Sequence, residues 1–293
     1  MEINAVTRAQ RYVGEHHTDG DFSVAKVCRA VGYSRRQLDR LFLKYLGLTV
    51  SGYINAVVLS ESAKTLIGSG ASVTEVALDS HLSSPEGYSR AFARRFSLTP
   101  DRYRREKTAV PMFTQYPANH YSILKEGKTM DEPGIVTVTQ CDRPKRKLIY
   151  LTSRRAEGYL SFCEEMGCDW EGLLNSIPEK LDTAALIELP DFLHENGISK
   201  TASGVEVPLD YEKPLPDGYR IAELPECTML YFQSEPYENP DDFGLYIGQV
   251  FMAIENYDLA RHGLAPAEDL APEFNFGAET HSGARAAIPV VRK

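Results

Sequence analysis

The sequence predicts two domains: an all-α N-terminal domain with two helix-turn-helix units joined by a long helix, and an α+β C-terminal domain. Three observations lead to this prediction. Residues 34–53 recur fifty residues later as 84–103, the spacing of apolar residues changes after about residue 134, and the net charge changes sign between the two halves. A chain of 293 residues is also long enough for two domains with separate cores.

The internal repeat defines the basic unit of the N-terminal half, since a repeated pattern indicates a repeated supersecondary structure. In both copies a serine precedes an amphipathic stretch, and an arginine recurs on its polar face. The positions that are identical at a single offset are Ser34/Ser84, Arg40/Arg90, Phe42/Phe92, Leu48/Leu98, Thr49/Thr99 and Tyr53/Tyr103.

Local signals predict that each copy begins with the second helix of a helix-turn-helix. Ser34 and Ser84 are suited to cap these helices, and Gln37 completes a capping box in the first. Shorter helices are predicted just before them, at Val24–Val31 and Val73–Ser80. Such a unit lays its second helix in the major groove of DNA. The alternative, a helical hairpin used only for packing, does not explain why both copies expose an arginine at the same place.

One uninterrupted helix is predicted between the two units, from Thr49 to about Gly68, because this stretch lacks proline and has apolar residues at helical spacing. About 20 residues at about 1.5 Å each span about 30 Å. Successive major grooves recur at about 34 Å. A monomer could therefore place both recognition helices in adjacent grooves. Further helices are expected at Glu2–His17 and after Thr99-Pro100.

The charge distribution is consistent with a nucleic-acid partner for one half of the chain. Residues 1–108 hold 16 basic and 11 acidic side chains, net +5, whereas residues 109–293 hold 16 and 30, net −14. Phosphate neutralisation supplies most of the nonspecific affinity for DNA, so the local charge matters more than the total of −9. We place the domains at 1–108 and 134–293, with a linker at 109–133.

Cysteine usage and hydropathy suggest a cytoplasmic protein. The five cysteines form no CxxC motif and have no histidine at zinc spacing, so neither a metal site nor a disulfide framework is predicted. No apolar run approaches about 20 residues, so no membrane segment is expected. No P-loop, dinucleotide fingerprint or G-x-S-x-G motif is present, so no cofactor or catalytic residue is assigned.

The C-terminal half is predicted to contain two strand-strand-helix-strand units in the same order, which would make the domain pseudo-symmetric. A hairpin is expected at Asp142-Arg143-Pro144, and a short strand near Met112–Tyr116 in the linker. The predicted helices are Glu157–Leu174 and Pro240–Asn256. The predicted strands are Ile135–Thr139, Lys147–Ser153, Thr183–Leu189, Gly204–Val207, Tyr219–Glu223, Thr228–Ser234, Glu273–Phe276 and Ala284–Val291.

Residues 5–105 resemble the DNA-binding domain of the AraC/XylS transcription regulators. The resemblance rests on the motif V-x4-G-Y-S-x3-L-x-R-x-F from Val27 to Phe42, and on a second motif with L-T-P from Arg90 to Arg104. It implies seven helices, two helix-turn-helix units, binding to double-stranded DNA, and activation or repression of transcription. RNA polymerase is a further partner that such a regulator can contact.

By position, the family's base-reading surface falls on one set of residues in each unit. These are Arg35, Arg36, Asp39 and Arg40 in the first unit, and Ser84, Glu86, Gly87, Ser89 and Arg90 in the second. Ser34, Lys44, Arg94 and Arg95 complete the predicted DNA-binding set, and at least one of Arg94 and Arg95 is expected to contact phosphate. Glu86 departs from the family's pattern, because it would repel phosphate unless it faces a cytosine amino group.

Residues 134–293 resemble the GyrI-like effector-binding domain, through Gly204–Asp210, Gly218–Phe232, Glu273–Phe276 and the C-terminal AIPVVRK. The order of the two domains resembles the Rob-type branch of the AraC regulators. The resemblance implies a cleft for amphipathic, often cationic small molecules, with aromatic walls and a carboxylate at its base. Glu273 matches that carboxylate, and the alternatives are Glu188, Glu206 and Glu255. The proposed walls are Trp170, Tyr150, Tyr231 and Tyr257.

Other functions of the C-terminal half remain open at this point. It could bind a protein partner, or its pocket could be closed. It could also hydrolyse small electrophiles, as some GyrI-like proteins do, with Glu273 and Tyr257 as the reacting pair. The attached DNA-binding half favours a sensor of small molecules over these alternatives.

Overall fold

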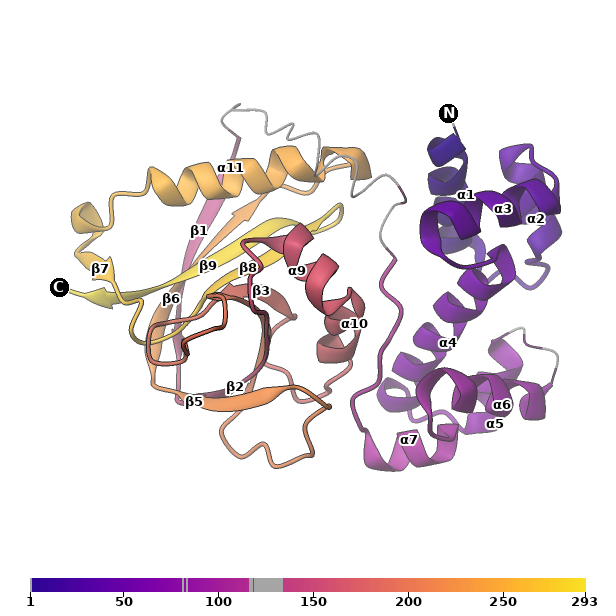
Figure 1. The fold of residues 1–293 in the computed structure, drawn as a ribbon, viewed down its shortest axis with the longest axis horizontal. Helices are drawn as coiled ribbons and strands as arrows, with labels where there is room; N and C mark the ends of the chain where they lie inside the picture. The colour runs from indigo at the N-terminus through magenta and orange to yellow at the C-terminus, as the bar shows by residue number, and fades with distance from the viewer. Residues whose placement is uncertain (1, 81, 83, 116–117, 119–133) are drawn as a thin grey trace. The chain divides into compact units, whose positions relative to one another are not determined.

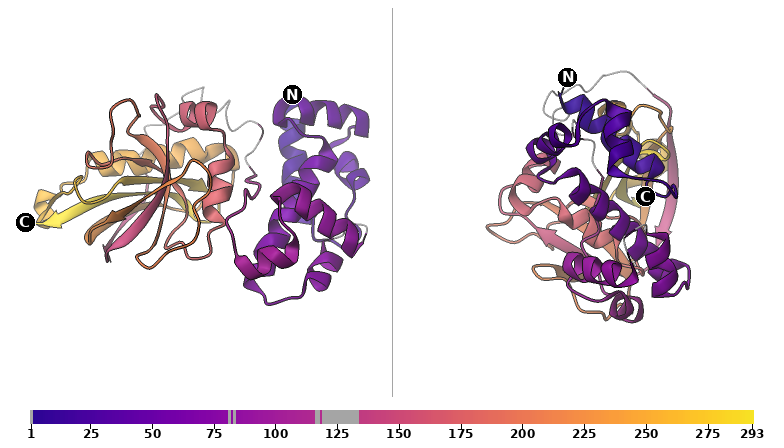
Figure 2. Two further views of the ribbon diagram at one scale, coloured as in Figure 1. Left: turned by 60° about the horizontal axis from the view of Figure 1, so that its bottom comes forward. Right: turned by 90° about the vertical axis from the view of Figure 1, so that its right-hand side faces the viewer.

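The computed structural model describes residues 2–80, 82, 84–115, 118 and 134–293, and it divides the chain into two compact units (Figure 1). The first unit comprises residues 1–120 with 176–178, and the second comprises 121–175 with 179–293. Helices make up the first unit, and an antiparallel sheet dominates the second (Figure 2). Most of the predicted linker, 109–133, lies outside the described residues.

The helices of the first unit confirm the predicted double helix-turn-helix. Each recognition helix is preceded by a short helix, and a single helix joins the two units, as the repeat indicates. In the described part of this unit the helices are α1 Glu2–His16, α2 Val24–Val31, α3 Arg35–Leu46, α4 Val50–Gly68, α5 Val73–Asp79, α6 Pro85–Phe96 and α7 Pro100–Glu106.

Helix α4 is buried along most of its length because it contributes to two cores. Its N-terminal half packs with α1, α2 and α3 through residues such as Tyr53 and Val57. Its C-terminal half packs with α5, α6 and α7 through Leu59 and Leu66. Figure 1 shows α4 running from one group of helices to the other. In the described residues no single helix is long and apolar enough to span a membrane; only α3 and α4 together, as a bent pair, meet that criterion.

The chain after α7 packs back along α4 in an extended conformation, and we call residues 110–115 the strap. Val110 and Met112 are buried in the second core, and Phe113 packs against the first. The Phe113 N–H donates to Ser60 Oγ of α4 at 2.7 Å. The predicted strand at 112–116 is therefore wrong for residues 112–115, because this backbone bonds to helix side chains and not to a sheet. Tyr116 lies outside the described residues.

The second unit contains one antiparallel sheet in the order β1-β6-β9-β8-β3-β4-β2-β5, with β7 also paired to β9. Strands β8 and β3 occupy its middle. The strands are β1 Val136–Arg143, β2 Arg146–Thr152, β3 Ala185–Glu188, β4 Thr201–Pro208, β5 Arg220–Leu224, β6 Cys227–Ser234, β7 Leu264–Pro266, β8 Glu273–Glu279 and β9 Gly283–Arg292.

Two predictions for this unit are wrong. The first two strands do not form a hairpin, since β1 pairs with β6, and β2 lies between β4 and β5. The helix predicted at 157–174 is two helices, α9 Tyr159–Met166 and α10 Asp169–Asn175. They are separated at Gly167, whose φ of 82° is accessible mainly to glycine. The short strand β7 was not predicted.

The two faces of the sheet pack differently. Helix α11, Phe243–Glu255, lies along one face and contacts β1, β6, β8 and β9 (Figure 1). Phe232 of β6 packs with Val250 of α11 on that face. Its neighbour Tyr231 packs with Phe274 of β8 on the opposite face, as the alternation of side chains along a strand requires.

Candidate nucleic-acid interface

Helices α3 and α6 begin with the same capping serine. Ser34 Oγ accepts from the Gln37 N–H, and the Gln37 side chain accepts from the Ser34 N–H at 3.1 Å, which completes the predicted capping box. Ser84 Oγ accepts from the Gly87 N–H at 3.0 Å. A side chain at Gly87 would crowd that oxygen, because an added Cβ would lie 3.3 Å from it. Both serines therefore set the start of a recognition helix, and their contact with DNA stays a prediction.

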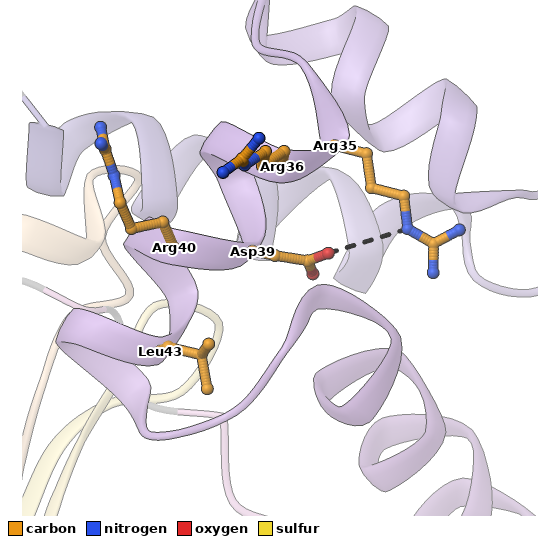
Figure 3. Close-up of a pocket in the computed structure, with 5 residues that line it drawn as sticks. All are labelled: Arg35, Arg36, Asp39, Arg40 and Leu43. Carbon is orange, nitrogen blue, oxygen red and sulfur yellow. Dashed lines mark ion pairs between the residues drawn. The ribbon is translucent and has the colours of Figure 1, made fainter.

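The outer face of α3 carries a groove lined by arginines. Arg36 and Arg40 are exposed along it. Figure 3 shows them projecting from the same side of the helix. The residues that line the groove are Arg35, Arg36, Asp39, Arg40 and Leu43. An exposed cationic face of this kind suits phosphates and the acceptor atoms of guanine.

Asp39 and Arg35 are held by contacts within the protein, although both were predicted to read bases. Asp39 Oδ1 accepts from the Val50 N–H at 2.9 Å, so it satisfies a free donor at the start of α4. Arg35 donates to Ser51 Oγ at 3.1 Å, and its Nε lies 3.7 Å from Asp39 Oδ2. These bonds attach α3 to α4, which leaves Arg36 and Arg40 as the better candidates for base contact.

Lys44, at the last turn of α3, forms an ion pair with Glu2 of α1, with Nζ 2.8 Å from Oε2. This hydrogen bond to Lys44 is the main reason why the pKa of Glu2 lies below its ordinary value. Both side chains are about half exposed, so the pair is weak and salt-sensitive. Lys44 is thus partly neutralised in the free protein.

The recognition helix of the second helix-turn-helix, α6, has a less cationic N-terminus than α3. Glu86 is exposed in the first turn of α6. The pKa of Glu86 is lowered by a hydrogen bond from its own backbone and by the Ser84 hydroxyl, so it remains charged at the helix N-terminus. Arg90 is exposed, whereas Gly87 and Ser89 are half-buried. A negative charge at this end reduces the attraction for phosphate.

Arg94 and Arg95 differ in their surroundings. Arg94 is exposed in the last turn of α6. Arg95 is half-buried, donates to the Pro111 carbonyl of the strap at 3.3 Å, and lies 5.9 Å from the centre of the Phe113 ring. Arg94 is therefore the stronger candidate for phosphate contact, while Arg95 fixes the strap to the second core.

The predicted effector residues do not gather at one place. Trp170 is buried in α10, edge-on to Phe162. Tyr150 is buried in β2 and belongs to the same packing group as Tyr231, whose hydroxyl accepts from Arg143 at 3.2 Å. Tyr257 packs edge-on against Phe232, on the face covered by α11.

Tyr231 and Tyr257 thus lie on opposite faces of the sheet and cannot line one cleft together. Because Phe274 packs with Tyr231, the preceding Glu273 points to the α11 face. Glu273 and Tyr257 are therefore on the same side, and Tyr150 and Tyr231 are on the other.

The four candidate carboxylates of the second unit differ in their availability for a ligand. Glu273 is paired in register with Glu188, and both side chains are exposed. Although the residue as a whole is exposed, neighbouring atoms partly desolvate the Glu273 carboxyl and raise its pKa, and the negative charges of Glu188 and Glu268 add to the effect. Glu206 is buried and forms an ion pair with Arg146, so it is not available to a ligand. Glu255, at the end of α11, is exposed.

Leu43 and Glu171 were not predicted as site residues from the sequence. Leu43 lies in the arginine groove of α3 and is 52% exposed, although its spacing from Arg36 and Arg40 was visible in the sequence. Glu171 of α10 is half-buried, and burial raises its pKa to about 7, with the charge of Glu279 adding to the effect. No local sequence signal identifies such a carboxyl, because its surroundings come from distant elements.

Comparison with known proteins agrees with the fold of the first unit. A helix-turn-helix domain family matches residues 27–106. The transcriptional regulator Rob of Salmonella typhimurium is 36% identical over 91 residues, which cover 31% of this chain and 32% of that protein. The TetD protein of transposon Tn10 from Escherichia coli is 33% identical over 93 residues, which cover 32% of this chain and 67% of that protein.

A crystal structure of an AraC-type transcriptional regulator from Chromobacterium violaceum is 29% identical, with a TM-score of 0.33, and the match covers 35% of this chain and 91% of that one. The chain spans about a third of the length of the Rob proteins that it matches. The match to TetD extends over two thirds of that protein, and the family match includes both recognition helices. The chain belongs to the AraC/XylS family of helix-turn-helix transcription regulators.

Proposed function

We propose that this protein is a one-component transcription regulator, in which the first unit binds double-stranded DNA at specific sites and the second binds a small effector. The observation that carries the DNA half of the proposal is the pair of capped recognition helices at the two ends of α4. Arg36 and Arg40 are exposed on one, and Arg90 on the other. The net charge of +5 in residues 1–108 supplies the general attraction for phosphate.

The spacing of the recognition helices supports binding by a single chain. Helix α4 has 19 residues, about 28 Å at about 1.5 Å per residue, which is close to the repeat of the major groove. Both recognition helices are attached to it: α3 through Asp39, and α6 through the Tyr88 hydroxyl, which donates to Ser62 Oγ at 3.1 Å. One monomer can thus present two helices to adjacent grooves on one face of the duplex.

Substitution of Arg40 tests sequence-specific binding. On a duplex selected from a random library, Arg40→Ala should weaken binding by about 1–3 kcal/mol, and on random DNA it should change binding little. Arg11→Ala, which removes an equal charge from an exposed position of α1, is the matched control and should affect both DNAs slightly and equally. Equal large losses on both DNAs for Arg40→Ala would make this residue a phosphate contact only.

For the second unit we propose a cation site at the middle of the sheet, with Glu273 as its carboxylate and Glu188 beside it. The two strand-strand-helix-strand halves would meet there, since β8 and β3 are the central strands. A carboxylate that lies beside a second carboxylate and is partly desolvated is stabilised when a cation approaches. Tyr257 is the aromatic candidate on this face, and the proposal leaves Tyr150, Tyr231 and the buried Trp170 as core residues.

A matched pair of ligands tests this site. N-methylacridinium and 9-methylanthracene have nearly the same shape and differ in charge. Glu273→Gln should weaken binding of the cation by about 1 kcal/mol or more, and it should leave the neutral compound nearly unaffected. The measurement is a fluorescence titration of the full chain. Equal affinity of both proteins for the cation would remove Glu273 from the site.

A further inference from the structure

Leu43 is an apolar side chain in an otherwise charged and polar groove. Helix α3 already has an apolar face, formed by Leu38, Leu41 and Phe42, each no more than 2% exposed. Leu43 lies outside that face and is 52% exposed. Single exposed leucines are common and need no explanation by themselves. This one differs because it lines the same groove as Arg36 and Arg40 (Figure 3).

The spacing of these three residues gives the groove a defined chemical order. Positions 36, 40 and 43 are separated by four and three residues, so their side chains follow one stripe along α3. The stripe therefore reads cation, cation, apolar group. Asp39 offsets one of the three arginine charges through its ion pair with Arg35, and Arg36 and Arg40 leave the groove cationic. A polyanion is therefore the complementary partner, and duplex DNA is the polyanion that a recognition helix of this type contacts.

A base-pair edge in the major groove offers one apolar group, the C5-methyl of thymine, beside the acceptor atoms that arginine binds. We propose that Leu43 packs against the C5-methyl group of a thymine and makes the first recognition helix selective for a T·A pair at that position. The inference rests on the proposed binding of duplex DNA. It adds a residue and a base identity that neither the repeat nor the family resemblance contains.

The second helix-turn-helix lacks an equivalent side chain, so the selectivity for thymine is expected only from the first. The repeat places Ala93 of α6 at the position equivalent to Leu43. Ala93 is half-buried and ends at Cβ, so it cannot reach as far from the helix. The next position is basic in both units, Lys44 and Arg94. The two recognition helices thus share Arg40/Arg90 and the basic position Lys44/Arg94, but α6 has Glu86 in place of Arg36 and Ala93 in place of Leu43.

Deoxyuridine substitution isolates the methyl group. The full chain is first used to select a preferred duplex. Each thymine in the part of that duplex bound by the first helix-turn-helix is then replaced by deoxyuridine, which removes only the C5-methyl group. At one position the wild-type protein should bind about fourfold more weakly, the value for one buried methyl group. Leu43→Ala should bind the thymine duplex at least about fourfold more weakly and should show no further loss with deoxyuridine. Leu209→Ala, at an exposed leucine of the second unit, should behave like the wild type.

Three results would overturn the proposal. The first is an equal loss with deoxyuridine in the wild type and in Leu43→Ala, which would show that Leu43 does not contact the methyl group. The second is unchanged DNA affinity of Leu43→Ala, which would show that this side chain does not contribute to DNA binding. The third is a wild-type protein that binds no duplex site, which would overturn the proposed function as well. Far-UV circular dichroism of the variant checks that the exposed substitution leaves the helices intact.

Discussion

Met112→Ala tests whether the strap is part of the N-terminal core. Met112 is 6% exposed and packs with residues of α4, α5, α6 and α7. Truncation of a buried methionine to alanine costs about 2–5 kcal/mol, because the site loses apolar contacts and retains a cavity. In a domain of this size about 1 kcal/mol corresponds to about 4–8 °C in the melting temperature. Even the lower cost should therefore lower the melting temperature of the first unit by about 8–16 °C.

The two units can be followed separately in one sample of the full chain. Far-UV circular dichroism at 222 nm reports mainly the helices of the first unit. Fluorescence of Trp170, the only tryptophan, reports the second unit. The substitution should shift the circular dichroism transition and leave the fluorescence transition in place. Met112→Leu, which nearly conserves volume, is the matched control and should cost less than about 1.5 kcal/mol. An unshifted helical transition in Met112→Ala would show that the strap does not support the core.

Two further predictions concern charge. Arg94→Gln should reduce the slope of log K against log salt concentration by about 1. Arg95→Gln should change this slope less, because Arg95 is held by the strap. Equal changes of slope in DNA titrations at several salt concentrations would contradict this difference. The second unit should lose stability as pH rises from about 5 to 8. Burial raises the pKa of the Glu171 carboxyl from its ordinary value of 4.5 to about 7 in the folded protein, so this group ionises at lower pH when the chain is unfolded. The loss is at most about 3 kcal/mol, and Glu171→Gln should abolish it; an identical pH dependence of Trp170 melting in both proteins would refute the assignment.

The first unit was predictable because its signals are local. A capping serine, the glutamine three residues later and the apolar spacing after it lie within one stretch of chain, and Ser34 and Gln37 form the expected bonds. The repeat supplied a second copy of the same signals, which supported the assignment of each helix. Helices with such capping residues can be predicted from their own sequence, without knowledge of distant residues.

The second unit was less predictable because strand pairing is decided by distant segments. The turn residues at 142–144 indicate a chain reversal, but they do not determine that β1 pairs with β6 and β2 with β4 and β5. The same limit applies to the strap. Its short apolar segment led to the prediction of a strand, yet α4 offers Ser60 as an acceptor, and the apolar side chains enter helical cores.

The candidate DNA-binding residues show the same division between local and distant information. The repeat correctly placed Arg40 on the outer face of α3, and Arg36, which the family resemblance assigned, is exposed there as well. It could not reveal that Asp39 bonds to the Val50 N–H, or that Arg95 donates to the Pro111 carbonyl, since both partners lie beyond the helix concerned. Position on a helix face gives exposure, whereas availability for a ligand also depends on what the rest of the fold brings to that face.

The differences between the two recognition helices suggest a division of labour along the DNA. The first helix exposes Arg36, Arg40 and Leu43, which are groups that discriminate between bases. The second exposes Arg90 but keeps a charged Glu86 at its N-terminus. Phosphate repels a carboxylate there, and the major groove offers it hydrogen-bond donors only at the amino groups of cytosine and adenine. In the proposed complex, readout by the first helix would fix where the second lies, because α4 connects both helices, and the second would contribute mainly by position.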